Sequence, residues 1–383
     1  MTHYDLAVIG GGIVGLAHAL AAARRRLKVC VIDRDRRSNG ASVRNFGFVT
    51  VTGQRAGVTW NRARRSRDVW AEVAPLAGIP VLHRGTAVVA HRPEAMAVLE
   101  QFAGGTMGEG CRLLDPGEVA RTLPMVRPGV HGALWSPHEL RVEPREALPK
   151  LAAFLASAHG VDFLWGVQAR GVETGAADAV VVDTTAGRIT ASRVAVCPGG
   201  DLLSLFPETL ARRGLTQSKL HMLRLAPQPA GWRLPGSVMQ DLSLVRYEGY
   251  TDLPGVPALK ARLDAEAGDA LANGIHLIVV QGADGSLVVG DSHHYDPTPD
   301  PFAPAGVDAI ILQHAAETLD IPDMTVTERW LGCYPSSPTE TAFIDAPDPA
   351  VRLSVVSSGT GMSTAFAIGE EAVADLFGEG PAP

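Results

Sequence analysis

Residues 6–15 read Leu-Ala-Val-Ile-Gly-Gly-Gly-Ile-Val-Gly, an apolar strand that runs into a glycine-rich turn. A helical stretch and a second apolar strand follow, and the second strand ends at Asp33. Glycines with this spacing allow a tight turn at Gly10, a close approach of the backbone to a pyrophosphate at Gly12, and close packing of helix on strand at Gly15. The segment therefore predicts a dinucleotide-binding unit.

The expected ligand contacts of this unit come from the backbone and from one carboxylate. Free N–H groups at the start of the helix, at Ile13 and Val14, are expected to face the phosphates. Asp33 is placed to accept hydrogen bonds from both hydroxyls of an adenosine ribose, and its charge disfavours a 2′-phosphate. Arg34, next to Asp33, is counted among the cofactor contacts. A glycine motif alone is weak evidence, but here the strand, helix, second strand and terminal acid occur together.

Length, charge and cysteine usage narrow the class of protein. A chain of 383 residues favours two domains. The net charge of −7 and the scattered basic residues argue against nucleic acid and against an anionic membrane surface. We expect no metal site and a cytoplasmic location with reduced thiols, because no Cys-x-x-Cys pair occurs among the four cysteines. Neither an export signal nor an apolar run long enough to span a membrane is found. The cysteines are Cys30, Cys111, Cys197 and Cys333.

Three features together resemble the D-amino acid oxidase and glycine/sarcosine oxidase superfamily of FAD enzymes. They are the N-terminal glycine motif, a buried strand that ends at Gly199-Gly200, and a closing strand that leads through Gly359-Thr360-Gly361-Met362 into a helix. The resemblance implies FAD as cofactor. It also implies an α/β FAD-binding Rossmann-like domain and an α+β substrate domain with a mainly antiparallel sheet. The FAD-binding domain is expected over residues 1–82, 150–210 and 325–383, and the substrate domain over 83–149 and 211–324.

The central strand-like runs agree with a second domain of different architecture. They are separated by turn residues, as in an antiparallel sheet. The runs cover residues 219–225, 243–250, 276–281 and 286–290.

The resemblance also implies roles for residues far from the first motif. Ser42, Arg44 and Asn45 match the loop that leads from the pyrophosphate towards the flavin, and Val167 matches a backbone contact on the adenine side. A helix N-terminus at the flavin pyrimidine would stabilise negative charge at N1 and O2 of the reduced ring. The further cofactor contacts expected are Gly199, Gly200, Gly332, Gly359, Thr360, Gly361 and Met362.

Three departures from the family patterns bear on the substrate. Members that act on α-amino acids carry a carboxylate-binding arginine shortly after a motif tryptophan, whereas here Trp330 is followed by Tyr334. A tyrosine cannot form a bidentate charged pair, which disfavours a simple D-amino acid. Cys333 lies one position from the usual place of covalent flavin attachment, and a plain buried cysteine is the alternative. Val288 stands at the place of an oxygen-activating lysine, so oxygen and another electron acceptor both stay open.

The predicted substrate domain is rich in cationic and hydrogen-bonding side chains, which suits a small amine with an anionic group other than a carboxylate. The candidate catalytic residues are Tyr334, Tyr247, Tyr250, His293 and Arg246. Adjacent histidines in a strand point to opposite faces, which disfavours a metal site at His293-His294. The polar residues of this region are Lys219, His221, Arg246, Tyr247, Tyr250, His276, His293, His294 and Tyr334.

The expected reaction is the oxidation of a C–N bond by hydride transfer to the flavin. Residues 42–48, 220–224 and 359–366 are similar to a bacterial subgroup associated with phosphonate catabolism. That resemblance implies an aminoalkylphosphonate substrate, such as 2-aminoethylphosphonate or its N-methyl form, and an aldehyde and an amine as products. One alternative is an oxidase for glycine, sarcosine or a D-amino acid. Another is a nicotinamide-dependent dehydrogenase or a non-catalytic dinucleotide-binding subunit.

Overall fold

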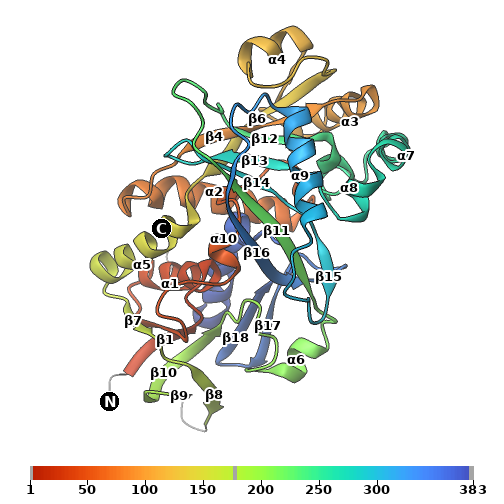
Figure 1. The fold of residues 1–383 in the computed structure, drawn as a ribbon. Coiled ribbons are helices and arrows are strands. Elements are labelled where there is room, and N and C mark those ends of the chain that lie inside the picture. Colours follow the sequence, from red (N-terminus) through yellow and green to blue (C-terminus); the bar gives the residue numbers. More distant parts are fainter. Residues whose placement is uncertain (1–2, 176–178, 379–383) are drawn as a thin grey trace.

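The computed structural model describes residues 3–175 and 179–378 and contains two β-sheets (Figure 1). Within these residues the first sheet, sheet A, has eight strands and the second, sheet B, has ten. Sheet A lies in the lower part of Figure 1 and sheet B in the upper part. Residues 1–2, 176–178 and 379–383, which fall in the predicted FAD-binding segments, lie outside the described residues.

Sheet A has the order β17-β18-β10-β1-β2-β7, and β9 and β8 extend it from β10. The pairs from β18 to β7 are parallel, whereas β17, β9 and β8 pair antiparallel. The apolar runs of β1, β2 and β10 suit strands that are covered on both faces. The bounds are β1 (His3–Ile9), β2 (Val29–Asp33), β7 (Asp162–Trp165), β8 (Ala169–Thr174), β9 (Val180–Thr184), β10 (Gly187–Val196), β17 (Ala342–Asp348) and β18 (Val351–Val356).

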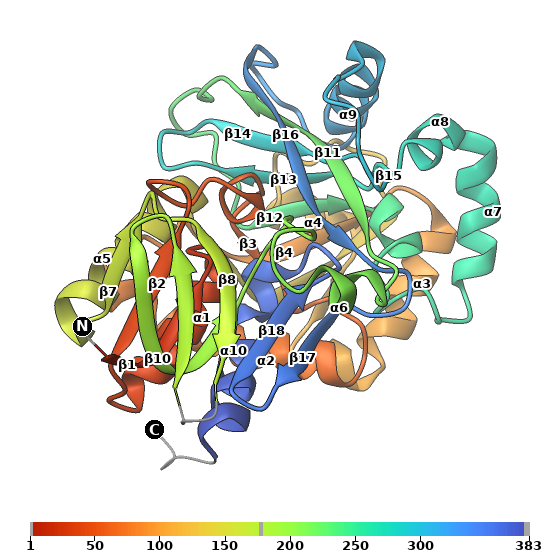
Figure 2. The same cartoon turned by 90° about the horizontal axis from the view of Figure 1, so that it is seen from below.

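The helices beside sheet A bring the two ends of the chain together. Helix α10 (Gly361–Phe377) packs along α1 (Ile13–Arg24), and a Cβ on Gly369 would lie only 2.7 Å from the backbone of Ala17. Helix α10 also contacts α2 (Val58–Leu76), where the Trp70 indole N–H donates to the carbonyl of Met362 over 2.8 Å. Helix α5 (Pro144–His159) lies on the other side of α1 (Figure 2).

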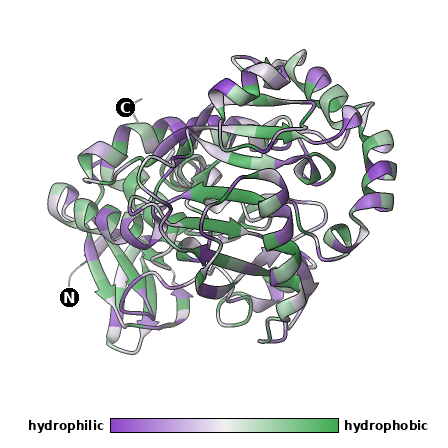
Figure 3. Ribbon diagram, turned by 45° about the horizontal axis from the view of Figure 1, so that its top comes forward, coloured by the Kyte–Doolittle hydropathy of each residue, from purple (hydrophilic) through white to green (hydrophobic). Residues whose placement is uncertain are grey.

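Sheet B has the order β15-β11-β14-β13-β12-β4-β6-β3, with β16 paired to β11 and β5 paired to β6. Its pairs are antiparallel except for β4 with β12. The strands in the middle of the molecule are strongly hydrophobic (Figure 3). The bounds are β3 (Phe48–Val49), β4 (His83–Ala90), β5 (Arg112–Leu114), β6 (Gly132–Arg141), β11 (Thr216–Leu225), β12 (Ser237–Gln240), β13 (Ile278–Gln281), β14 (Leu287–Gly290), β15 (His294–Asp296) and β16 (Val326–Ser336).

The other helices lie mainly around sheet B, and none of the described helices is long and apolar enough to cross a membrane. They are α3 (Pro93–Ala103), α4 (Pro116–Thr122), α6 (Pro207–Ala211), α7 (Val256–Glu266), α8 (Gly268–Ala272) and α9 (Ala305–Thr318). Short 3-10 helices are η1 (Ala41–Val43), η2 (Thr106–Gly108) and η3 (Asp241–Val245).

Segment 243–250 differs from the strand that its sequence predicts. It contains the end of η3 and a series of turns. Side chains of this region bind distant parts of the chain. Asp241 accepts a hydrogen bond from the N–H of His91 and forms a salt bridge with Arg92. Ser243 Oγ donates to the carbonyl of His276. Such side-chain hydrogen bonds compete with the backbone hydrogen bonds of a β-strand.

The predicted domain boundary at 324/325 does not coincide with a change of sheet. Strand β16 falls just after that boundary but pairs with β11 in sheet B, and β3 of the first segment also belongs to sheet B. The domain division itself stays a prediction.

Candidate active site

One cavity reaches from the start of α1 to the ends of the central strands of sheet B. The α1 turn, the loop around η1, the end of β16 and the start of α10 form one side of the lining. The segment after η3 and the loops next to β13 and β14 form the other side. The cavity therefore adjoins both sheets.

The α1 end of the cavity is built for close contact with backbone groups. A Cβ on Gly15 would lie 1.8 Å from the carbonyl oxygen of Gly10, so a larger residue at 15 cannot be accommodated. Helix α1 has no side-chain cap and no acidic residue in its first turn. The N–H of Ile13 donates to Ser42 Oγ over 2.9 Å, which ties the η1 loop to the helix start. This end suits the negative charge of a pyrophosphate.

A second helix N-terminus opens onto the same cavity at α10. This helix also lacks a side-chain cap and an acidic residue in its first turn. Gly359 has φ +74° and would place a Cβ 2.8 Å from Cζ of Tyr334, so the ring of Tyr334 can pack here only against a glycine. The uncapped N–H groups of α10 suit the negative charge that a reduced flavin carries on its pyrimidine ring.

The structure divides the expected cofactor contacts into two groups. Those that line the cavity are Gly12, Ile13, Val14, Gly15, Ser42, Arg44, Asn45, Gly199, Gly332, Gly359, Thr360, Gly361 and Met362. Those outside its lining are Gly10, Asp33, Arg34, Val167 and Gly200. Cofactor contact stays a prediction for both groups.

Asp33 is held at the end of β2 by backbone donors. Its Oδ2 accepts from the N–H of Gly11 over 2.5 Å and its Oδ1 from the N–H of Asp35 over 2.8 Å. Burial raises the pKa of the carboxyl, against the effect of these hydrogen bonds. The ring of Trp165 packs closely on Gly11, because a Cβ on Gly11 would lie only 2.5 Å from it. Trp165 was not predicted from the sequence. Arg34 instead pairs with Asp201 over 2.8 Å.

Four of the five candidate catalytic residues line the cavity at the sheet B end, namely Arg246, Tyr247, His293 and Tyr334. The expectation for Tyr250 is corrected, because its side chain is 1% exposed and lies in the hydrophobic core. Its ring packs against Phe102 with the ring centroids 4.7 Å apart. Residues 243–250 are not a strand, so their side chains do not alternate between two faces, and Tyr250 belongs to the core while Arg246 lines the cavity.

Arg246 forms no salt bridge in residues 3–175 and 179–378, although the charge of Asp291 is near enough to raise the pKa of its guanidinium. Its Nη2 donates to the hydroxyl of Tyr295 over 2.8 Å, and Tyr295 also lines the cavity. Burial raises the pKa of Tyr334 to about 12, so this nearby phenol stays neutral and can donate a hydrogen bond. The surroundings of Arg246 therefore offer a positive charge and phenol donors to an anion.

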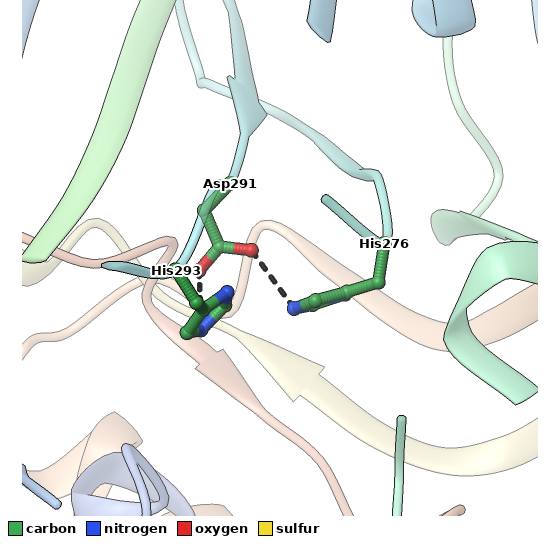
Figure 4. A group of neighbouring side chains, drawn as sticks. All are labelled: His276, Asp291 and His293. Atoms are coloured by element: carbon green, nitrogen blue, oxygen red, sulfur yellow. Dashed lines mark ion pairs between the residues drawn. The ribbon is translucent and has the colours of Figure 1, made fainter. Parts of the chain in front are cut away.

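A second polar group of the cavity wall consists of His276, Asp291 and His293 (Figure 4). Strands β13 and β14 are antiparallel with Ile278 opposite Gly290, so the segment that precedes β13 and the segment that follows β14 meet at the same edge. His276 Nε2 lies 3.0 Å from Oδ1 of Asp291, and His293 Nε2 lies 3.6 Å from Oδ2.

Charges around Asp291 keep this carboxylate ionised. Burial alone would raise its pKa, but the two imidazoles and Arg246 outweigh burial and hold the pKa at about 2. Sequence reasoning missed Asp291. Its signal is the polar run Asp291-Ser292-His293 directly after the apolar strand that ends at Gly290.

The other polar residues predicted for the substrate domain have structural partners outside the cavity. Lys219 Nζ pairs with Asp300 over 2.9 Å, and His221 Nδ1 pairs with Asp308 over 3.0 Å. Both alternate along β11 with Leu220 and Met222, which line the cavity, as side chains on a strand must. His294 Nε2 lies 3.1 Å from Asn273 Oδ1.

No lysine of the described chain lines the cavity. Val288, at the place of the family's oxygen-activating lysine, is 1% exposed and belongs to the hydrophobic core. Cys333 is a free thiol, and its covalent attachment to flavin stays a prediction.

Comparison with known proteins agrees with this architecture. A model of the family described as DAO, FAD dependent oxidoreductase, matches residues 5–376. The bifunctional protein ThiO/ThiG of Nostoc sp. is 24% identical over 350 residues, which is 89% of this chain, and the chain spans about half (47%) of that relative's length.

Two solved structures show the same fold. Glycine oxidase from Geobacillus kaustophilus superposes with a TM-score of 0.78 at 20% identity, covering 98% of this chain and 95% of the other. Dithionite-reduced L-α-glycerophosphate oxidase from Mycoplasma pneumoniae, with FAD bound, has a TM-score of 0.75 at 16% identity over 98% and 95% of the two chains. The names of these two proteins refer to different substrates, so the fold does not decide the substrate.

The chain belongs to the DAO family of FAD-dependent oxidoreductases. The family match and the two uncapped helix N-termini on one cavity agree with FAD as the cofactor, which is the prediction from the sequence. The family match does not support the alternative of a nicotinamide-dependent dehydrogenase.

Proposed function

We propose that this FAD-dependent oxidoreductase oxidises the C–N bond of a small amine that carries an anionic group. The substrate we propose is an aminoalkylphosphonate, either 2-aminoethylphosphonate or its N-methyl form. Oxidation gives an imine, which water then hydrolyses to an aldehyde and ammonia or methylamine. The observation that supports this most is the unpaired guanidinium of Arg246 in the wall of the cavity.

Arg246 fits the anionic end of such a substrate. A buried or half-buried cation without a carboxylate partner is costly unless a ligand supplies the negative charge. Tyr295 and Tyr334 lie close to the guanidinium and can add O–H donors. A phosphonate has three oxygens to accept these bonds, whereas a carboxylate has two.

The residues of the cavity bind and orient the substrate, and FAD supplies the chemistry by accepting a hydride from the carbon that bears the nitrogen. Arg246 holds the anion, so that the amine end is directed along the wall towards His293 and Tyr334. The apolar side chains of Phe46, Leu220 and Met222 line the same cavity and exclude water from the reacting carbon.

The alternative substrate is glycine, sarcosine or a D-amino acid, with Arg246 binding its carboxylate. Tyr334, at the place of the family's carboxylate-binding arginine, supports the phosphonate over the amino acid, because a neutral phenol cannot form the bidentate charged pair.

The test is a visible spectrum of the purified protein before and after each candidate amine is added without oxygen. The candidates are 2-aminoethylphosphonate, its N-methyl form, glycine, sarcosine and D-alanine. We expect the flavin bands to bleach fastest with one of the two phosphonates. Faster bleaching with an amino acid would replace the proposal with the alternative, and no bleaching with any amine would favour a non-catalytic subunit.

A further inference from the structure

We propose that Asp291 and His293, positioned by His276, form the binding site for the amino group of the substrate, and that Nε2 of His293 accepts its proton. The inference rests on the proposed function, since it assigns the amine end of the same substrate. It adds to Arg246 a second recognition point in the same cavity.

The hydrogen-bond partner of His293 fixes which ring nitrogen carries hydrogen. Nδ1 lies 3.0 Å from the carbonyl oxygen of Gly274, and a carbonyl can only accept, so Nδ1 must be the donor. Burial lowers the pKa of His293 well below 6.5, and the nearby Arg246 lowers it further. At neutral pH Nε2 therefore has a free lone pair.

This lone pair faces another acceptor. Nε2 of His293 lies 3.6 Å from Oδ2 of Asp291, and a carboxylate with a pKa of about 2 carries no hydrogen at neutral pH. The other oxygen, Oδ1, is buried and lies 3.0 Å from Nε2 of His276, so the oxygen that faces His293 is the one without a nearby donor. Buried acceptors are rarely left without a donor. The arrangement thus calls for a ligand that brings N–H groups between His293 and Asp291.

The rings around Asp291 are held in place by aromatic contacts. The His276 and His293 rings stack with centroids 5.1 Å apart and an interplanar angle of 30°, and Tyr247 meets His276 edge-on at 5.3 Å. His276 is 3% exposed and contacts Oδ1 of Asp291 over 3.0 Å. His276 therefore acts as a positioning residue.

An ammonium group suits this cluster better than a metal ion. The potential ligand atoms of His276, Asp291 and His293 lie within 4.8 Å of one another, as a metal site would require. However, the two imidazole rings are stacked on one another, an arrangement that is unfavourable for two ligands of one tetrahedral ion. Arg246 also adds positive charge nearby. An ammonium needs no common point, because each N–H group reaches its own acceptor.

The proton transfer balances without a further reactant. One N–H bond of the substrate ammonium breaks and an Nε2–H bond forms on His293, while the electron pair stays on the substrate nitrogen. The amine would then be neutral, the form from which a bound FAD would accept a hydride. The positive charge moves from substrate to imidazole beside Asp291, so the buried site keeps the same net charge throughout.

The test measures binding without turnover. FAD in the holoenzyme is first reduced with dithionite, and calorimetry without oxygen compares ligands that differ only by the amine: 2-aminoethylphosphonate with ethylphosphonate, and glycine with acetate. We expect the Asp291→Asn variant to lose about tenfold or more in affinity for the amine-bearing ligand and little for its partner, because a charged hydrogen bond is lost. His293→Gln is expected to act in the same direction, and His294→Gln is the control.

The two ligand pairs separate failure of the inference from failure of the proposed function. If only the glycine pair binds, the phosphonate proposal fails while the amine site is still tested by that pair. Equal losses for both members of the bound pair in Asp291→Asn would overturn the amine site. Binding of neither pair would overturn both proposals. A metal ion that co-purifies in stoichiometric amount and is lost in Asp291→Asn would replace the ammonium with a metal.

A second readout follows proton transfer. In rapid mixing of oxidised enzyme with the bleaching amine, His293→Gln should slow flavin reduction at saturating substrate about a hundredfold at neutral pH. Raising the pH, which deprotonates the free amine, should restore most of the rate. An undiminished rate at neutral pH would overturn the role of His293 as proton acceptor.

Discussion

The two ends of the cavity present different kinds of surface. At the α1 and α10 end, glycines and the backbone N–H groups of two helix starts form much of the surface, with Arg44 of the η1 loop beside them. At the sheet B end, Arg246, Asp291 and His293 provide charges and imidazoles from loops between strands. The shape of the first end depends on backbone conformations that glycine allows. The chemistry of the second end depends on which side chains the topology brings together. This difference predicts different consequences of mutation at the two ends.

The largest effect is expected from Gly15→Ala at the backbone end. A Cβ there would lie 1.8 Å from the carbonyl oxygen of Gly10, so α1 cannot keep its position on the turn. We expect a protein that purifies without yellow colour, measured as the ratio of flavin to protein absorbance. Gly40→Ala is the matched control, since a Cβ at Gly40 meets nothing within 4 Å. Full flavin content in Gly15→Ala would contradict the role of this glycine.

At the side-chain end, Arg246→Met should leave flavin content unchanged and raise KM for the anionic amine about a hundredfold, as removal of one partner from a desolvated charge pair does. Steady-state kinetics with the bleaching amine measure this change. Arg188→Met is the control, because Arg188 in β10 is exposed and pairs with Glu173 in β8 of sheet A. A rise in KM below threefold would show that the anion binds elsewhere.

A third prediction concerns pH and the backbone end. His18 in α1 is fully buried, with its ring nitrogens 2.7 Å from the carbonyl oxygen of Val14 and 2.9 Å from Ser354 Oγ. Burial lowers its pKa from 6.5 to about 4. Between these values the unfolded chain binds a proton that the folded chain does not, so acidification below pH 6.5 destabilises the fold.

The size of the His18 effect can be measured by urea unfolding of the holoenzyme. From pH 7 to pH 5 the parent should lose about 2 kcal/mol through His18, which His18→Gln does not lose. The difference in stability between the two proteins should therefore narrow on acidification. The exposed His131→Gln serves as control. A constant difference between the parent and His18→Gln would contradict a neutral buried imidazole.

The smallest effect is expected for Tyr250→Phe. The Tyr250 hydroxyl is buried without a hydrogen-bond partner in the described chain and lies outside the cavity lining. Its removal should change kcat and KM less than about twofold, whereas Tyr334→Phe should raise KM about fivefold through a lost hydrogen bond. Steady-state kinetics of both variants test the corrected position of Tyr250. Equal changes in KM for Tyr250→Phe and Tyr334→Phe would show that Tyr250 does contact the substrate.

The backbone end could be predicted from sequence because its determinants are local. The glycine spacing at 10, 12 and 15 and the acid at 33 each follow from the geometry of one strand, turn and helix. The start of α10 could be predicted in the same way, from glycines between a buried strand and a helix. Family resemblance then implied that these segments are parts of one FAD site. The match over residues 5–376 confirms the family, and the cofactor contacts stay a prediction.

The side-chain end could be predicted only in part. Arg246, Tyr247 and His293 were expected at the substrate, but their neighbour Asp291 was not, because its position depends on the antiparallel register of β13 and β14. Tyr250 was misplaced because the hydrogen bonds of Asp241 and Ser243, which reach to residues 91 and 276, override the strand tendency of 243–250. Such contacts join distant segments and leave no local pattern.

Contact between α1 and α10 has a consequence for biosynthesis. The ribosome makes the glycine turn at Gly10–Gly15 first, but the helix that completes the other end of the FAD cavity starts only at Gly361. A nascent chain therefore has half of the cofactor site for most of its synthesis. Under the proposal that this cavity holds FAD, we expect tight binding of the cofactor only after α10 has been synthesised.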